Sequence, residues 1–315
     1  MCRWTCFSSS GGGFFLNIKV TIGGVELKNP VLTASGTFGS GMEYKEFIDL
    51  NCLGGIVTKG VASVPWHGND VPRVAETYGG MLNAIGLQNP GMEVFIKRDL
   101  PFLKQYDTKI IVNVCGRTEE DYIEVVERLR DEEVDMLEIN VSCPNVKEGG
   151  IAFGQNPLSL ENITRKVKEK AKQPIIMKLS PNVTDITEMA KAAESGGADA
   201  VSLINTITGM KIDIHKRKFA LANKTGGLSG PAVKPIALRM VYQVCQCISL
   251  PVIGMGGIMN GEDAVEFFLA GASAVAVGTA NFHDPYALIK VLKGIEDYME
   301  KYEVKDIHDI IGKVQ

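Results

Sequence analysis

From residue 31 onward the chain repeats one pattern of hydrophobic and polar positions. A short apolar run rich in β-branched residues is followed by a turn and then by apolar residues at helical spacing. Eight such runs predict strands: Val31–Ser35, Gly55–Thr58, Ile110–Val114, Met136–Val141, Ile175–Leu179, Ala200–Ile204, Val252–Gly254 and Ala274–Val277. Continuous apolar strands that alternate with helices indicate a parallel sheet covered by helices. Eight repeats predict an α/β fold of the (β/α)₈ TIM-barrel type.

Helical spacing follows several of these strands. The clearest predicted helices are Glu119–Asp131, Thr184–Ser195, Val233–Cys247, Gly261–Ala270 and Pro285–Lys301. For the second of these, Thr184 is the predicted start with Asp185 in the first turn, and Gly196-Gly197 is the predicted end.

A doubly wound sheet is the alternative fold. It would carry a Gly-x-Gly-x-x-Gly turn after the first strand, where this chain has Gly36-Thr37-Phe38-Gly39. The sequence therefore favours the barrel.

Two further features complete the predicted layout. Asn17–Ile22 and Val25–Leu27 flank Gly23-Gly24 and predict a β-hairpin, which we expect at the bottom of the barrel. Residues 1–16 contain a Ser/Gly run and predict a flexible tail, native or not, ahead of a single barrel domain over residues 17–315.

Two connections after strands are long, and both are predicted to be long βα loops. They follow the fourth strand, from Cys143 to about Pro157, and the sixth, from Asn205 to about Pro231. Barrel active sites are built from such loops at the carboxyl ends of the strands. We therefore expect the functional face there.

Composition narrows the class of protein. The 315 residues carry a formal net charge of −4, so a nucleic-acid partner is not expected. The basic run His215–Lys218 is interpreted as a solvated loop. No apolar run approaches the roughly 18 to 20 residues that span a bilayer, which favours a cytoplasmic protein with no membrane partner.

Seven cysteines are scattered, at positions 2, 6, 52, 115, 143, 245 and 247, and none form a Cys-x-x-Cys pair. Neither a disulfide framework nor an iron–sulfur or other metal site within the chain is expected. Cys245 and Cys247 both fall in a predicted helix.

Polar side chains gather at the predicted strand ends. They are Lys59, Asn113, Asn140, Lys178 and the pair Asn205-Thr206. Each alone is more often a satisfied core group, but barrel interiors favour branched apolar side chains. Two buried lysines would need anionic partners. We therefore expect an electron-rich ligand between them.

Glycines follow the last two strands, as Gly256-Gly257 and Gly278-Thr279. Barrels often bind a phosphate at these two loops, where glycine lets the backbone approach closely. This pattern predicts a phosphate and leaves the reaction open.

Cys143 stands in Asn140-Val141-Ser142-Cys143-Pro144-Asn145, just after the fourth strand. A lone cysteine is usually a small buried hydrophobe, but this position favours a reactive thiol that could act as a general base. The amide-rich segment Asn83–Gly91 could bind an anionic small molecule, or it could be a plain turn.

Taken together, these motifs resemble those of the class 1 dihydroorotate dehydrogenases, over residues 17 to about 300. The matching motifs are Leu32–Gly36, Thr58–Gly60, Asn83–Gly91, Asn140–Asn145, Lys178–Pro181, Asn205-Thr206, Thr225–Gly230 and the two glycine pairs.

The resemblance implies FMN as cofactor, contacted by Ser35, Lys59, Gly60, Asn113, Asn140, Lys178, Ile204, Gly230, Gly256, Gly257, Gly278 and Thr279. It implies dihydroorotate or orotate at Lys59, Asn83, Ala84, Ile85, Gly86, Leu87, Asn140, Asn145, Asn205 and Thr206. Cys143 and Lys59 are the implied catalytic residues of a pyrimidine-biosynthesis (UMP) step in which hydride passes to FMN.

The stretch Thr225–Val241 looks most like class 1B. That class implies a homodimer core within a heterotetramer, with FAD and [2Fe–2S] on a partner subunit that passes electrons to NAD⁺. The rival interpretations are the fumarate-dependent class 1A, a uracil-reducing dihydropyrimidine dehydrogenase type, a tRNA-modifying flavin barrel and a non-redox phosphate-binding barrel.

Overall fold

Eight parallel strands form a closed barrel in the computed structural model, which describes residues 16–142 and 153–315. They are β3 (Val31–Thr33), β4 (Gly55–Val57), β7 (Lys109–Val114), β8 (Met136–Asn140), β9 (Ile175–Lys178), β10 (Ala200–Leu203), β15 (Val252–Met255) and β16 (Ala274–Val277). The last strand pairs with the first through Val275 beside Val31 and Val277 beside Thr33, which closes the ring. The predicted barrel and its eight strands are confirmed, and the doubly wound alternative is wrong.

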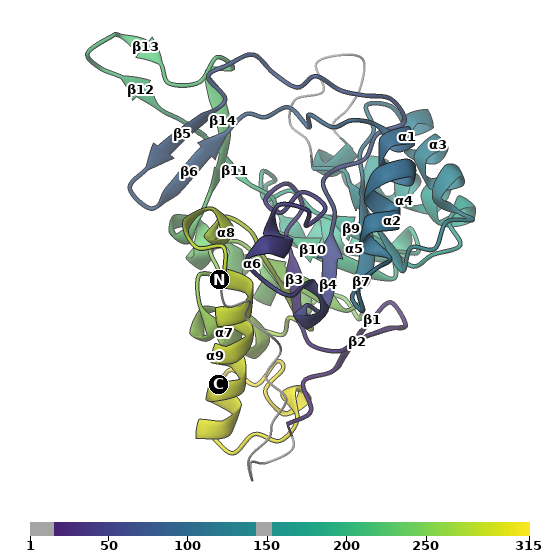
Figure 1. The fold of residues 1–315 in the computed structure, drawn as a ribbon, viewed down its shortest axis with the longest axis vertical. Coiled ribbons are helices and arrows are strands. Elements are labelled where there is room, and N and C mark those ends of the chain that lie inside the picture. The colour runs from purple at the N-terminus through teal and green to yellow at the C-terminus, as the bar shows by residue number, and fades with distance from the viewer. Residues whose placement is uncertain (1–15, 143–152) are drawn as a thin grey trace.

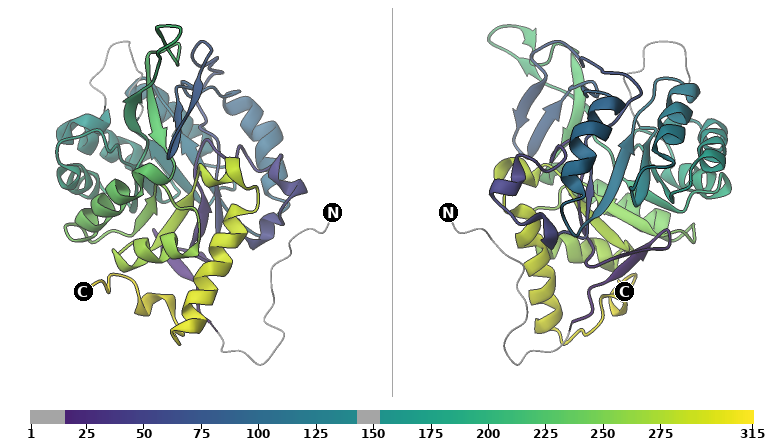
Figure 2. Two further views of the ribbon diagram at one scale, coloured as in Figure 1. Left: turned by 90° about the vertical axis from the view of Figure 1, so that its left-hand side faces the viewer. Right: turned by 45° about the vertical axis from the view of Figure 1, so that its right-hand side comes forward.

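The barrel strands are apolar because both of their faces are covered. All residues of β8, β9, β10, β15 and β16 are buried. Helices pack around the outside of the ring (Figures 1 and 2). They include α3 (Glu119–Leu129), α4 (Pro157–Lys170), α5 (Ile186–Ser195), α6 (Lys234–Cys245), α7 (Gly261–Leu269) and α9 (Ala287–Lys301). Shorter helical pieces are α1 (Met92–Val94), α2 (Leu100–Leu103) and α8 (Ala280–His283).

The predicted start of α5 needs correction. Asp185 is its N-cap, with a side chain that accepts a hydrogen bond from the backbone N–H of Thr187, so Thr184 lies outside the helix. A carboxylate at this position is also stabilised by the positive end of the helix dipole. The predicted end is confirmed, because Gly196 is the C-cap and Gly197 has a φ of +91°. Cys247 lies beyond the end of α6, not within it.

The predicted hairpin is confirmed as β1 (Val20–Ile22) and β2 (Val25–Leu27). Gly23 and Gly24 turn with φ of +56° and +83°, a conformation that glycine adopts without strain. Gly23 lies against Pro174 and Asp199, which precede β9 and β10. The hairpin therefore lies at the amino ends of the strands, at the bottom of the barrel (Figure 1).

An antiparallel sheet stands over the opposite end of the barrel (Figure 1). Its order is β11 (Ile207–Met210), β14 (Thr225–Ser229), β6 (Gly80–Asn83) and β5 (Val74–Thr77), so two distant insertions build it. A two-stranded ribbon, β12 (Ile212–Asp213) and β13 (Lys218–Phe219), extends from it.

The long connection over residues 205–231 is confirmed, and it contains strands of its own that the sequence analysis did not predict. Its strands pair with a segment more than a hundred residues away, as in Leu228 beside Leu82, and such pairing leaves little local pattern. The other long connection falls largely on residues 143–152, outside the described residues.

No helix in the described ranges has both the length and the apolar character required to cross a membrane.

Candidate active site

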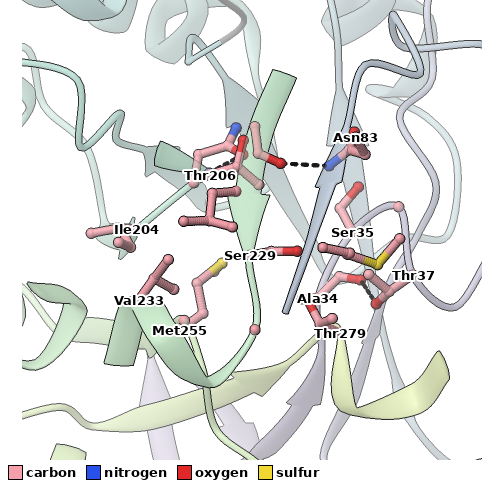
Figure 3. Close-up of a pocket in the computed structure, with 18 of the residues that line it drawn as sticks. Ala34, Ser35, Thr37, Asn83, Ile204, Thr206, Ser229, Val233, Met255 and Thr279 are labelled. Atoms are coloured by element: carbon pink, nitrogen blue, oxygen red, sulfur yellow. Dashed lines mark hydrogen bonds between the residues drawn. The ribbon is translucent and has the colours of Figure 1, made fainter. Parts of the chain in front are cut away.

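A cavity of about 290 Å³ lies between the carboxyl ends of the barrel strands and the antiparallel sheet. It is near the lower end of the size range of small-molecule sites. Figure 3 shows Asn83 and Thr206 on the side of the sheet, and Val233, Met255 and Thr279 on the side of the barrel. The cavity occupies the face that the long connections predicted.

Two lysines line this cavity from different strands. Lys178 is the last residue of β9, and Lys59 lies two residues beyond β4 beside the turn at Gly36. The side chain of Lys178 is only 5% exposed, so its ammonium group sits in a low-dielectric interior. The arrangement favours a ligand that is anionic or becomes negatively charged.

A chain of amide and hydroxyl groups joins the ends of β8 and β10. Ser142 Oγ donates to the amide oxygen of Asn140 at 2.7 Å, and the Asn205 amide donates to Ser142. The Tyr122 hydroxyl donates to the backbone carbonyl of Asn140 at 2.8 Å, which fixes the strand end. These bonds orient the Asn140 and Asn205 side chains before any ligand arrives.

The antiparallel sheet supplies the roof of the cavity. The Asn83 amide reaches the carbonyl of Gly227 on β14 at 3.5 Å (Figure 3). The carbonyl of Thr206 accepts from the Asn182 amide at 3.0 Å. The segment from Asn83 to Leu87 then continues along the cavity wall.

Glycines form the opposite wall, after β15 and β16. Gly256 and Gly257 have φ of +125° and +79°, and a Cβ on Gly257 would lie 2.8 Å from the Lys234 Cβ. Gly278 precedes the short helix α8, and its Cβ would lie 3.3 Å from the Ala34 Cβ. Exposed backbone N–H groups in such a wall can bind an anionic group such as a phosphate.

Most residues predicted for the site meet at this one cavity. Those that line it are Ser35, Lys59, Gly60, Asn83, Ala84, Ile85, Gly86, Leu87, Asn140, Lys178, Ile204, Asn205, Thr206, Gly230, Gly256, Gly257, Gly278 and Thr279. Asn113 does not reach the wall: it is fully buried beneath Asn140, 3.5 Å from that amide. Cys143 and Asn145 lie outside the described residues.

One polar residue beneath the cavity was missed by the sequence analysis. Glu138 accepts hydrogen bonds from the Asn113 amide at 2.6 Å and from Ser202 Oγ at 2.8 Å. Its carboxylate lies 3.7 Å from the Lys178 ammonium. The available signal was an acidic residue inside an otherwise apolar run, Met136-Leu137-Glu138-Ile139.

The site offers cations, amides and a backbone cradle, and it shows no metal-ligand set. Within residues 16–142 and 153–315, no three His, Cys, Asp or Glu side chains gather as a metal ion would require. The geometry suits a phosphate-bearing cofactor next to a small, amide-rich anion.

The family model and two of the most similar relatives agree on one family. The family model described as dihydroorotate dehydrogenase matches residues 17–299. The catalytic subunit of dihydroorotate dehydrogenase B (NAD(+)) from Lachnoclostridium phytofermentans is 70% identical over 300 residues, which are 95% of this chain and all of that protein. Its counterpart from Alkaliphilus oremlandii is 65% identical over 298 residues, 95% of this chain and 99% of that protein.

A solved structure supports the fold. The dihydroorotate dehydrogenase of Eimeria tenella, crystallised with ferulenol, superposes with a TM-score of 0.77 at 23% identity. The match covers 94% of this chain and 88% of the other. At this identity the likeness concerns the barrel architecture alone.

Proposed function

Because this chain belongs to the dihydroorotate dehydrogenase family, we propose that its cavity binds FMN and dihydroorotate side by side. The activity is the flavin-dependent oxidation of (S)-dihydroorotate to orotate, a step of de novo pyrimidine (UMP) synthesis. The single observation that carries the assignment is the convergence of Lys59, Lys178 and the amides of Asn83, Asn140 and Asn205 on one cavity.

The glycine wall fits the phosphate of FMN. Gly256 and Gly257 leave space where side chains would project, and both take backbone angles that other residues rarely adopt. We assign the phosphate to these residues together with Gly278 and Thr279. The residues that would hold the flavin ring are Ser35, Gly60, Asn140, Lys178, Ile204 and Gly230.

The opposite side of the cavity fits the substrate. Lys59 would pair with the carboxylate of dihydroorotate, and the amides of Asn83, Asn140 and Asn205 match its ring amide groups. Thr206, the wall from Ala84 to Leu87, and Asn145 complete the proposed substrate set.

The chemistry divides between the cofactor and the protein. When bound, FMN supplies the two-electron acceptor for the hydride that leaves C6 of dihydroorotate. Cys143, as thiolate, takes the proton from C5, so the C5–C6 double bond of orotate forms with atoms and charge in balance. Lys59 and Lys178 offset the negative charge that develops in the cavity.

Anaerobic absorbance spectroscopy tests this half-reaction. The purified, FMN-loaded protein should lose its flavin absorbance when dihydroorotate is added, and uracil or dihydrouracil should leave it unchanged. A yellow protein that dihydroorotate does not bleach would contradict the proposal.

We further propose the class 1B arrangement, supported by the names of relatives up to 70% identical. In it, two copies of this chain form the core of a heterotetramer in the cytoplasm. Electrons leave through a partner subunit that carries FAD and [2Fe–2S] and reduces NAD⁺. Neither nucleic acid nor a membrane takes part.

The acceptor separates this arrangement from class 1A. After bleaching by dihydroorotate, NAD⁺ should leave the flavin of this chain reduced when the chain is alone. NAD⁺ should restore the flavin absorbance once the partner subunit is added. Rapid reoxidation by fumarate without any partner would instead assign the chain to class 1A.

A further inference from the structure

Four polar side chains form a contact cluster inside the barrel at the floor of the cavity. Glu138 on β8 lies beside Asn113 on β7, and Lys178 on β9 lies beside Ser202 on β10, as the strand register requires. Glu138 accepts from Asn113 and Ser202 at 2.6 and 2.8 Å, so both carboxylate oxygens have hydrogen bonds. Its side chain is 1% exposed.

The charges of Glu138 and Lys178 balance each other inside the barrel. Of the described residues, the buried charged ones are Asp99, Glu138, Lys178 and Asp263. Asp99 pairs with Arg98, and Asp263 with Lys234. Glu138 and Lys178 are left as partners, 3.7 Å apart. A buried ion that loses its partner is strongly destabilised in its charged form.

The surroundings of Lys178 make Glu138 its acidic neighbour. The strand neighbours of Lys178, Asn140 on β8 and Ser202 on β10, are uncharged. Lys59 brings a second positive charge to the same cavity. Lys178 reaches the cavity wall and Glu138 does not.

We propose that Glu138 is a positioning residue for the flavin half-reaction: its buried carboxylate keeps the Lys178 ammonium charged and fixed at the cavity floor. This inference rests on the proposed FMN site. A charged Lys178 stabilises reduced flavin more than oxidised flavin, because reduction adds negative charge. Glu138 therefore sets the reduction potential of the flavin without touching it.

The test is the midpoint potential of bound FMN at pH 9, measured with dithionite and a reference dye. In Glu138→Gln, Lys178 loses the carboxylate 3.7 Å away that holds its ammonium charged and in place, and the potential should fall below that of the wild type. We expect a shift on the order of tenfold in the reduction equilibrium, about 30 mV for a two-electron couple.

Two controls separate this role from a merely structural one. Ser202→Ala removes a hydrogen bond to Glu138 but no charge, and should keep the wild-type potential. In a Lys178→Met background, adding Glu138→Gln should lower the potential no further. A Glu138→Gln potential equal to or above that of the wild type would overturn the proposal, since Lys178 would then hold its charge alone.

Stability of the FMN-free protein gives an independent readout. Glu138→Gln, Lys178→Met and the double variant form a double-mutant cycle under urea unfolding. The double variant should be more stable than the sum of the single effects predicts, because each single variant leaves one buried charge unpaired. Additive effects would overturn the proposal even if Glu138→Gln retained no FMN.

Failure here is distinguishable from failure of the proposed function. Dithionite reduces the flavin without dihydroorotate, and the stability cycle uses neither molecule. A protein that does not bleach with dihydroorotate can still pass both tests of Glu138.

Discussion

At the scale of single residues, the glycine wall of the cavity makes the most restrictive demand on the sequence. Gly257→Ala should lose FMN and be destabilised by roughly 1 to 2 kcal/mol from its left-handed backbone alone. Its Cβ would also lie 2.8 Å from the Lys234 Cβ. FMN content after dialysis and urea unfolding measure the two effects.

Gly24→Ala is the matched control. Gly24 has a similar φ of +83°, but its Cβ would meet nothing within 4 Å, and it lies in the hairpin turn away from the cavity. This variant should show the backbone strain and keep FMN. Equal FMN loss in both variants would argue against a cofactor wall at Gly257.

The predicted base gives a second residue-scale test. Cys143→Ala should bind FMN normally and slow bleaching by dihydroorotate by at least about a hundredfold, the usual contribution of a general base. Stopped-flow absorbance measures the rate. Normal bleaching would refute the role of Cys143.

Cys245 provides the control for that experiment. Burial raises the pKa of the Cys245 thiol to about 12, so it stays protonated at neutral pH, and it lies at the end of α6. Cys245→Ala should therefore bleach at the wild-type rate.

The strand pattern alone predicted the polar cavity residues that follow apolar strands, which are Lys59, Asn140, Lys178, Asn205 and Thr206. The cavity residues Ser35, Gly60, Ile204 and Gly230 were implied only by the family resemblance. Asn113 stands in the same pattern but supports the layer below the cavity, since a strand's polar residue can face the interior at more than one depth. Glu138 was missed for the same reason: the pattern marks strand ends and says little of the layer beneath.

At the scale of elements, β14 determines where Thr206 lies. A Cβ on Gly227 would fall 1.9 Å from Thr206 Oγ1, so Gly227→Ala should displace that side chain. We expect the KM for dihydroorotate to rise about tenfold, which is about 1.4 kcal/mol of binding, with FMN retention unchanged. Steady-state kinetics with the reconstituted enzyme measures it.

Gly209→Ala tests whether any added methyl in this sheet has the same effect. Its Cβ would approach the end of the Leu82 side chain at 3.1 Å and would not meet Thr206. The KM should stay near the wild-type value, and a rise equal to that of Gly227→Ala would point to general loosening of the sheet.

Asp306 joins the start of the folded chain to its C-terminal region. Its carboxylate caps the turn Ile307–Asp309 and accepts from the Asn17 amide at 2.7 Å. Asp306→Ala should lower the free energy of unfolding by about 1 kcal/mol at pH 7, the usual contribution of a cap. Urea unfolding provides the measurement.

The pH dependence of this effect has a defined sign. The hydrogen bond from the His308 backbone N–H lowers the Asp306 pKa below 3.8 despite some burial. The stabilisation is complete well above pH 3.8 and is lost as the pH falls through the lowered pKa. The difference between Asp306→Ala and wild type should therefore shrink at pH 3.5, and a constant difference would exclude the charged carboxylate as its source.

Elements differ in how far their sequences predict them. The barrel strands are predictable because burial on both faces makes them continuously apolar, as in Ile175–Lys178. The strand Thr225–Ser229 contains two glycines and resembles a turn, and only its distant partners β6 and β11 make it a strand. Long-range pairing is a property that a local pattern does not contain.

At the scale of the whole molecule, the buried barrel strands and the exposed ribbon β12–β13 should differ in local stability. Amide hydrogen exchange should be slowest in β7 and β8, which are buried and paired on both sides, and fastest in β12 and β13, which are short and largely exposed. Adding FMN to the apoprotein should slow exchange around Gly256 and Gly278. No protection there would contradict the proposed phosphate site.

Closure of the barrel was predictable from the count of strand–helix repeats. The number of subunits and the electron acceptor depend on other molecules, so the pattern of one chain does not predict them. Family membership disfavours the uracil-reducing, tRNA-modifying and non-redox interpretations. The reoxidation experiment with NAD⁺ and fumarate identifies the electron acceptor.

The roof of the cavity consists of one insertion that contains β5 and β6 and another that contains β11 and β14. Neither insertion completes the sheet alone, because β6 and β14 are each other's inner neighbours. During divergence, then, the two insertions should be gained, lost or resized together across relatives. Exchanging substrate preference by grafting would require transplanting both segments at once, while the eight-stranded frame beneath them could remain untouched.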